Sequence, residues 1–187
     1  MKKLIGFFIL MLAIAVPVQA KKVAGVEIPD TLDAGGVELA LNGAGVRTKY
    51  FMDIYVGGLY LTSSSSNAKA IMSANESMGL RLHIVSGMVT GEDMEEAVTE
   101  GFDNATNGKT EAMSANIDAF VQVFREPIAK DDTFNIIYEP GAGIQVYKND
   151  EHKGTIVGDM AFKQALFGIW LGDKPAHGKL KSGMLGK

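Results

Sequence analysis

The residue best suited to bind an anion is Arg47, one of only three arginines outside the first twenty residues. Gly43-Ala-Gly45 predicts a turn just before it, and the aromatic and β-branched stretch 51–61 predicts a strand just after it. A guanidinium is permanently charged and holds a carboxylate or an enolate through two parallel hydrogen bonds. In apolar surroundings it needs a buried acidic partner or an anionic ligand. Arg47 is therefore a candidate anion clamp, with a structural salt bridge as the alternative.

Two tyrosines on the same segment could assist this arginine. Tyr50 and Tyr55 lie three and eight residues after Arg47, and a phenol hydroxyl can donate a hydrogen bond to an anion. The pattern does not fix the face of the strand on which each tyrosine lies. We predict a ligand-binding set of Arg47, Tyr55 and Tyr50.

The sequence gives little support for a metal site, a thiol site or a dinucleotide site. The three histidines (His83, His152 and His177) lack metal-ligand spacing, and the chain has no cysteine. Gly43-Ala-Gly45 lacks the third glycine and the following helix of a dinucleotide fingerprint. We therefore predict no metal and no cofactor, and assign no catalytic residue.

The N-terminus predicts export. Lys2 and Lys3 precede an apolar run that is too short to span a bilayer, and Val18-Gln-Ala20 is typical of a cleavage site. We expect residues 1–20 to be a signal peptide and residues 21–187 to form a single periplasmic domain without a stable membrane span. The net charge of −4, made more negative by loss of the two lysines, argues against nucleic-acid binding. The oligomeric state stays open.

Strands and helices are predicted in blocks rather than in alternation, which favours an α+β fold. The predicted strands are 37–41, 51–61, 80–85, 133–138, 144–147 and 155–157, with a turn over 149–152. The predicted helices are 68–75, one beginning after Thr90, one around 117–124 and one at 160–171. Gly57-Gly58 indicates a bulge or a close backbone approach. We expect an antiparallel sheet covered on one face by helices.

On several motifs the chain resembles the chalcone isomerase superfamily, specifically its bacterial chalcone isomerase-like branch. The motifs are Leu41-Asn-Gly-Ala-Gly-Val-Arg47-Thr-Lys, Val56-Gly-Gly-Leu-Tyr60-Leu, Tyr138-Glu-Pro-Gly-Ala-Gly143 and Phe167-Gly-Ile-Trp170-Leu-Gly-Asp-Lys-Pro175. The resemblance covers nearly the whole chain after residue 20. It implies an open-faced β-sandwich with a ligand cleft between sheet and helices.

The resemblance also implies a set of site positions. The superfamily's arginine matches Arg47, while its strand threonine falls on Tyr55. Its helix tyrosine and asparagine fall on Met94 and Gly101, and its remaining threonine or serine lies near Lys163. One functional residue of the set is thus retained, which argues against isomerase chemistry, because that chemistry depends on positioning.

Three hypotheses of function remain. The superfamily contains non-catalytic members that bind fatty acids through an arginine and a tyrosine, so the first is a binder of a small hydrophobic acid, fatty or aromatic. The second is an intramolecular lyase or isomerase acting on an unknown substrate. The third is a structural or interaction protein of the cell envelope.

Overall fold

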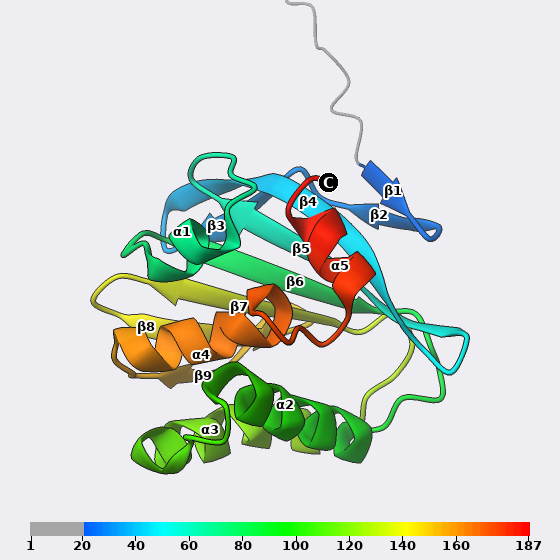
Figure 1. The fold of residues 1–187 in the computed structure, drawn as a ribbon. Helices are drawn as coiled ribbons and strands as arrows, with labels where there is room; N and C mark the ends of the chain where they lie inside the picture. Colours follow the sequence, from blue (N-terminus) through cyan, green and yellow to red (C-terminus); the bar gives the residue numbers. More distant parts are fainter. Residues whose placement is uncertain (1–20) are drawn as a thin grey trace, which may run out of the picture.

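The computed structural model describes residues 21–187, and the predicted signal peptide lies outside the described residues. Its centre is an antiparallel seven-stranded sheet in which the strands follow one another in chain order (Figure 1). The strands are β3 (Thr31–Ala34), β4 (Val37–Lys49), β5 (Met52–Leu61), β6 (Met78–Ile84), β7 (Thr133–Glu139), β8 (Gly143–Lys148) and β9 (Glu151–Ile156). A separate ribbon of β1 (Lys21–Val23) and β2 (Val26–Ile28) precedes it.

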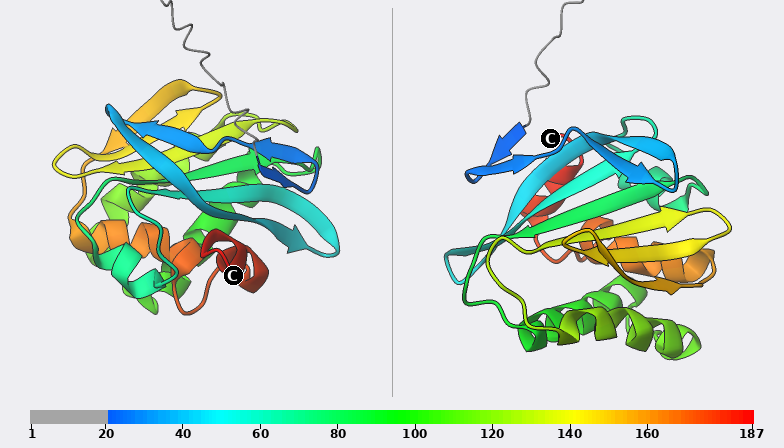
Figure 2. Two further views of the ribbon diagram at one scale, coloured as in Figure 1. Left: turned by 90° about the horizontal axis from the view of Figure 1, so that it is seen from above. Right: turned by 180° about the vertical axis from the view of Figure 1, so that it is seen from behind.

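Helices gather on one face of this sheet, as Figures 1 and 2 show. They are α1 (Ala68–Ser73), α2 (Gly91–Thr106), α3 (Ser114–Val121), α4 (Met160–Leu171) and α5 (Gly178–Met184), with 3-10 turns at Glu111–Met113 and Gln122–Arg125. Side-chain caps start three of them: Asn67 for α1, Thr90 in a capping box with Asp93 for α2, and Asp159 for α4. This is the predicted α+β class.

The two faces of the sheet carry separate apolar clusters. The larger cluster packs inward-facing residues of β5 to β9 against the helices, and α4 is buried almost around its full circumference. The smaller cluster lies on the opposite face, where Ile28 of β2 and Leu39 of β4 meet Val56 and Tyr60 of β5. Among the described residues, no helix is both long and apolar enough to cross a bilayer.

The prediction of a turn at Gly43-Ala-Gly45 is wrong. Both glycines lie inside β4, where α5 packs directly on them. A Cβ on Gly43 would overlap the Gly183 carbonyl oxygen of α5, and one on Gly45 would lie 3.0 Å from the Leu180 carbonyl oxygen. The glycines serve close helix–strand contact, which a sequence pattern does not separate from a turn.

Several element boundaries also differ from the prediction. The chain reverses at Tyr50–Phe51, so Phe51 belongs to a hairpin turn and not to a strand. The helix predicted over 68–75 ends at Ser73, and β9 begins at Glu151, which places His152 in a strand rather than a turn. The strands β1 to β3 and the helix α5 were not predicted, because all four are shorter than eight residues and carry little periodicity.

Candidate functional site

The candidate site lies at one end of the sheet, where the β4–β5 hairpin approaches the start of α2. Arg47 on β4 pairs directly with Tyr55 on β5. Directly opposed residues in an antiparallel pair share one face of the sheet, and Tyr55 belongs to the cluster beneath the helices. Arg47 therefore projects to the helix-covered side. Its guanidinium carbon lies 5.7 Å from the centroid of the Tyr55 ring.

A β-bulge in β5 shapes the space beside this pair. The register shifts between Arg47 and Thr48, which leaves Ile54 as the extra residue opposite them. The alternation of side chains changes sign at a bulge, so the consecutive residues Ile54 and Tyr55 both pack on the helix side. The bulge predicted at Gly57-Gly58 is wrong, since the bulges lie elsewhere. Its alternative, a close backbone approach, is not found either, because side chains approach these glycines: a Cβ on Gly57 would lie 2.6 Å from the Met184 side chain of α5.

A cleft of about 200 Å³ opens at this end of the molecule. Apolar side chains dominate its lining, with the buried Met94 and Val89 and the half-buried Ile54 among them. Arg47 is half-buried in the wall, and Tyr50 and Lys49 lie at the exposed hairpin end. The full lining is Arg47, Lys49, Tyr50, Met52, Ile54, Ser86, Met88, Val89, Asp93, Met94 and Ala97.

The charged residues of the cleft leave the Arg47 guanidinium available to bind an anion. No carboxylate lies within ion-pair distance of Arg47 in the part of the chain that the structure describes. The one acidic residue in the lining, Asp93, accepts hydrogen bonds from the Thr90 hydroxyl (2.6 Å) and backbone amide (2.9 Å). These bonds lower the pKa of the Asp93 carboxyl, with a smaller contribution from Lys49. The cleft thus combines two cations with one carboxylate that is engaged as a helix cap.

Tyr55 lies behind the cleft wall and is 1% exposed. Its hydroxyl oxygen accepts a hydrogen bond from Trp170 Nε1 of α4 at 2.8 Å. Among residues 21–187, no acceptor is found for the hydroxyl proton of Tyr55 itself. Burial raises the pKa of the Tyr55 hydroxyl, while the Arg47 charge and the Trp170 bond act in the opposite direction. The hydroxyl therefore stays protonated and able to donate.

Two of the three predicted ligand-binding residues lie together, and the third lies apart from them. Arg47 and Tyr55 come together as a pair, whereas Tyr50 is 79% exposed in the hairpin turn and contacts Lys49, whose Nζ lies 5.5 Å from the Tyr50 ring centroid. Trp170 was not predicted as a site residue. Its signal in the sequence, a helical apolar stripe, indicated only a core residue.

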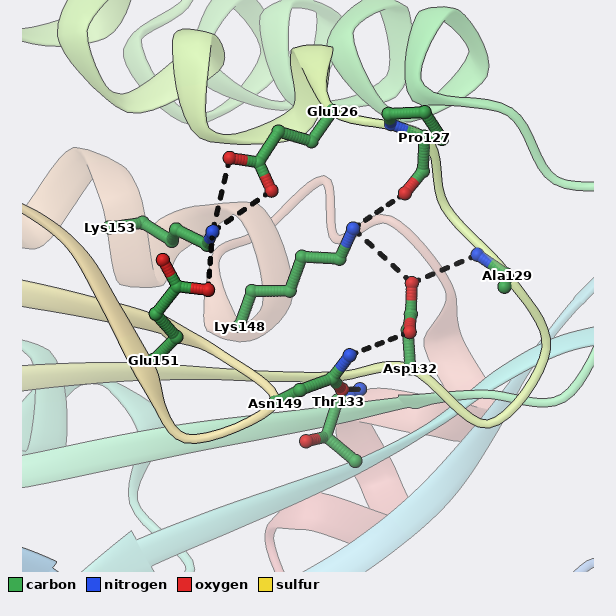
Figure 3. Close-up of polar contacts among 9 residues, drawn as sticks. All are labelled: Glu126, Pro127, Ala129, Asp132, Thr133, Lys148, Asn149, Glu151 and Lys153. Atoms are coloured by element: carbon green, nitrogen blue, oxygen red, sulfur yellow. Dashed lines mark hydrogen bonds and ion pairs between the residues drawn. The ribbon is translucent and has the colours of Figure 1, made fainter.

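A network of polar contacts joins the segment before β7 to the β8–β9 hairpin (Figure 3), and none of its residues lines the cleft. Lys148 Nζ contacts the Asp132 carboxylate at 3.3 Å and donates to the Pro127 carbonyl oxygen, while Asn149 and the Ala129 amide donate to the same carboxylate. Burial alone would raise the pKa of Asp132, but these donors together lower it. The backbone of Asp132 accepts from the Ile84 amide, which anchors the end of β6.

The loop that lines the cleft begins directly after the end of β6. The Val85 and Ser86 amides donate to the Ile54 carbonyl oxygen at the bulge, at 3.0 and 3.3 Å. The chain then passes through Met88 and Val89 before α2 begins. The cleft is consequently lined by the β4–β5 hairpin, by the loop that follows β6 and by the first turns of α2. The two hydrogen bonds to Ile54 tie the start of this loop to β5.

The three remaining superfamily positions carry no polar group toward a ligand. Met94 lines the cleft with an apolar thioether. Gly101 forms the contact between α2 and α4, where a Cβ would lie 2.6 Å from Ile169. Lys163 is buried and donates to the carbonyl oxygens of Ile71, Met72 and Ala74 at 2.9 to 3.1 Å, so it closes the C-terminal end of α1.

Comparisons with known proteins agree with this fold. The model of the chalcone isomerase-like family matches residues 20–186. The chain belongs to the chalcone isomerase-like family. The fold is also similar to the crystal structure of a fatty-acid binding protein of Arabidopsis thaliana, with a TM-score of 0.68 and 18% identity over 86% of this chain and 92% of that one. At this identity the likeness shows the fold alone. A search of curated protein sequences gives no match.

Proposed function

We propose that this protein is a non-catalytic binder of a small hydrophobic acid, and that Arg47 clamps the carboxylate. The observation that carries the proposal is a half-buried arginine in the wall of an apolar cleft without an ion-pair partner among residues 21–187. A desolvated guanidinium gains most from a carboxylate that presents two oxygens. The similar fatty-acid binding protein supports this class of ligand.

Tyr55 has a supporting role in this proposal. Its ring lies beside the guanidinium and its hydroxyl accepts from Trp170, so the ring and the hydroxyl have fixed positions. Because Tyr55 is buried behind the cleft wall, its part is to support the guanidinium from below, and a direct bond from its hydroxyl to the ligand would require the wall to open. Tyr50 contributes to the mouth of the cleft rather than to its anionic end, because it lies in the exposed turn.

The size and lining of the cleft favour a short or planar acid. A volume of about 200 Å³ is small for a ligand site. Three methionines, Met52, Met88 and Met94, line it, and unbranched thioether side chains adapt to irregular ligands. Octanoate and cinnamate are suitable probes, as one fatty and one aromatic carboxylate.

The absence of catalysis follows from what occupies the superfamily positions. Met94, Gly101 and Lys163 are committed to the apolar lining, to helix packing and to a helix end. A site that positions a reacting substrate needs several fixed polar groups, because most catalytic power comes from positioning and preorganised charge.

The proposal also places the binder outside the cytoplasm, in the periplasm, after cleavage behind Ala20. The support is the pattern of the first twenty residues, which lie outside the described residues. Mass measurement of protein expressed from the full sequence tests it, because a mass that includes residues 1–20 would contradict cleavage.

Isothermal titration of octanoate and cinnamate into wild type and Arg47→Met tests the binding proposal. Loss of one charge-assisted pair is expected to weaken binding about 10- to 100-fold. Arg125→Met is the matched control, because Arg125 is exposed and lies outside the cleft. Equal affinities of wild type and Arg47→Met would remove the clamp from the proposal.

A further inference from the structure

An exposed apolar tip stands at the mouth of the cleft. Tyr50, Phe51 and Met52 form the end of the β4–β5 hairpin, and Met88 lies on the neighbouring loop. Phe51 is fully exposed, Tyr50 and Met88 are 79% and 68% exposed, and Met52 is 38% exposed. Tyr50, Met52 and Met88 also line the cleft, so the tip and the cleft are continuous.

The backbone of this tip is unusual. Four hairpins in the described residues turn through two residues that both have positive φ. Two of them use only residues suited to that conformation, Gly35-Gly36 and Asn149-Asp150, and a third, Ala24-Gly25, combines a small residue with glycine. The fourth uses Tyr50 and Phe51, at φ of 49° and 65°. Bulky side chains are strained there, and Phe51 has no burial that would offset the strain.

Folding alone does not require two aromatic residues in this strained turn, so we look for a function of their exposed side chains. The hairpin projects beyond the body of the sheet in both views of Figure 2, which lets its tip reach a flat surface. Aromatic residues with a polar edge, next to a lysine, are typical of groups that rest at a lipid–water interface. Lys49 Nζ lies over the Tyr50 ring and supplies that lysine.

We infer that the hairpin tip of Tyr50, Phe51 and Met52, with Met88, docks reversibly on a lipid surface and brings the cleft mouth to the membrane. The inference rests on the proposed function, because a hydrophobic acid partitions into lipid and would pass between bilayer and cleft across this apolar rim. The negative net charge, −4 for the full sequence and more negative without Lys2 and Lys3, predicts that docking depends on the apolar tip and that neutral lipid suffices.

Phe51→Gly separates docking from both folding and acid binding. Phe51 does not line the cleft, and glycine adopts its φ without strain. The variant should therefore be at least as stable as wild type and bind octanoate equally in lipid-free solution. Flotation with neutral phosphatidylcholine vesicles should show its lipid affinity reduced about tenfold, as expected for loss of one interfacial aromatic side chain. Val157→Ser, an exposed apolar residue at the opposite end of the sheet, is the matched control.

The protein is expressed from its full sequence, and the N-terminus of each preparation is verified by mass so that the variants are compared in the same form. Equal flotation of wild type and Phe51→Gly, or failure of both to float, overturns the inference. So does a wild-type dimer that Phe51→Gly dissociates, because a second copy would then cover the tip.

The same samples separate this inference from the proposed function. Arg47→Met should float as wild type does and yet lose octanoate affinity. Tip-dependent flotation without octanoate binding by wild type would refute the acid-binding proposal and retain the docking surface. Octanoate binding without tip-dependent flotation would refute docking alone.

Discussion

Arg47 and Tyr55 occupy directly opposed positions of β4 and β5, one bulge away from the hairpin turn, with the guanidinium 5.7 Å from the tyrosine ring centroid. The pair joins the cleft to the core, because Arg47 lines the cleft while the Tyr55 hydroxyl accepts from Trp170 of α4.

The hydrogen bond between Trp170 and Tyr55 gives the first prediction. Tyr55→Phe leaves the buried indole N–H without its acceptor, so the free energy of unfolding should fall by about 1–3 kcal/mol. Urea unfolding followed by tryptophan fluorescence measures the loss. Tyr147→Phe is the control, because Tyr147 lies on the opposite face and its hydroxyl has no hydrogen bond to the described residues. Equal stability of the Tyr55 variant and wild type would show that the bond contributes nothing.

The packing of α5 on β4 gives the second prediction. Gly43→Ala should lower the free energy of unfolding by about 1–3 kcal/mol or more, because the new methyl group meets the backbone of Gly183, which cannot move alone. Gly154→Ala is also in a strand, but the new Cβ would meet no atom within 4 Å, so it should change stability by less than about 0.5 kcal/mol. Thermal unfolding of both variants measures the two changes in stability. An equal loss of stability in both variants would contradict the proposed effect of α5 packing.

Lys163 gives a third prediction, on alkaline stability. Burial lowers the pKa of Lys163 to about 8, from an ordinary value of 10.5. Between these values the unfolded state binds more protons, so the stability contribution of this group should rise with pH from about 8 toward 10. Above pH 10 the opposite trend sets in, because burial raises the pKa of Tyr60 to about 12 and raises that of Tyr55 as well.

Urea unfolding at several pH values tests this dependence. In Lys163→Met the rise should disappear, and overall stability should fall because three carbonyl groups at the end of α1 lose their donor. Lys69→Met, on the exposed surface of the same helix, should keep the wild-type profile. A wild-type profile in the Lys163 variant would refute the assignment.

Asp132 gives a fourth prediction, on acid stability. Its pKa is lowered in the folded state, so its contribution is present above the ordinary carboxyl pKa of 3.8 and is lost as pH falls through the folded value. Asp132→Asn should be less stable than wild type at neutral pH, and the difference should shrink below about pH 4. Asp150→Asn, in an exposed turn, is the control. A difference that persists unchanged at low pH would contradict the linkage.

Much of the fold was open to prediction because its longer elements are periodic. The helix at 160–171 was predicted with the bounds that α4 has. β7 extends one residue beyond its prediction at one end, and β8 extends one residue beyond its prediction at each end. The segment 42–51 was misread for a physical reason. Glycines at 43 and 45 look like a turn, whereas they accommodate a helix that arrives from the far end of the chain, and the true turn carries two aromatic residues that rarely form one.

The site was predictable only in part. Arg47 and Tyr55 were identified from residue type and resemblance, and the structure places them as neighbours. The position of Tyr50 depended on the turn, and the common face of Ile54 and Tyr55 depended on the bulge. Neither irregularity has a signal in a period-two pattern, because a bulge adds one residue without changing the type of its neighbours.

The most direct test of the account is the dissociation constant of octanoate for wild type and for Arg47→Met, measured side by side by isothermal titration in lipid-free buffer. The account predicts saturable one-site binding by wild type, a 10- to 100-fold weaker constant for Arg47→Met, and an unchanged constant for Arg125→Met. Identical constants in the three proteins, or heat that never saturates in wild type, would contradict an anion clamp at Arg47.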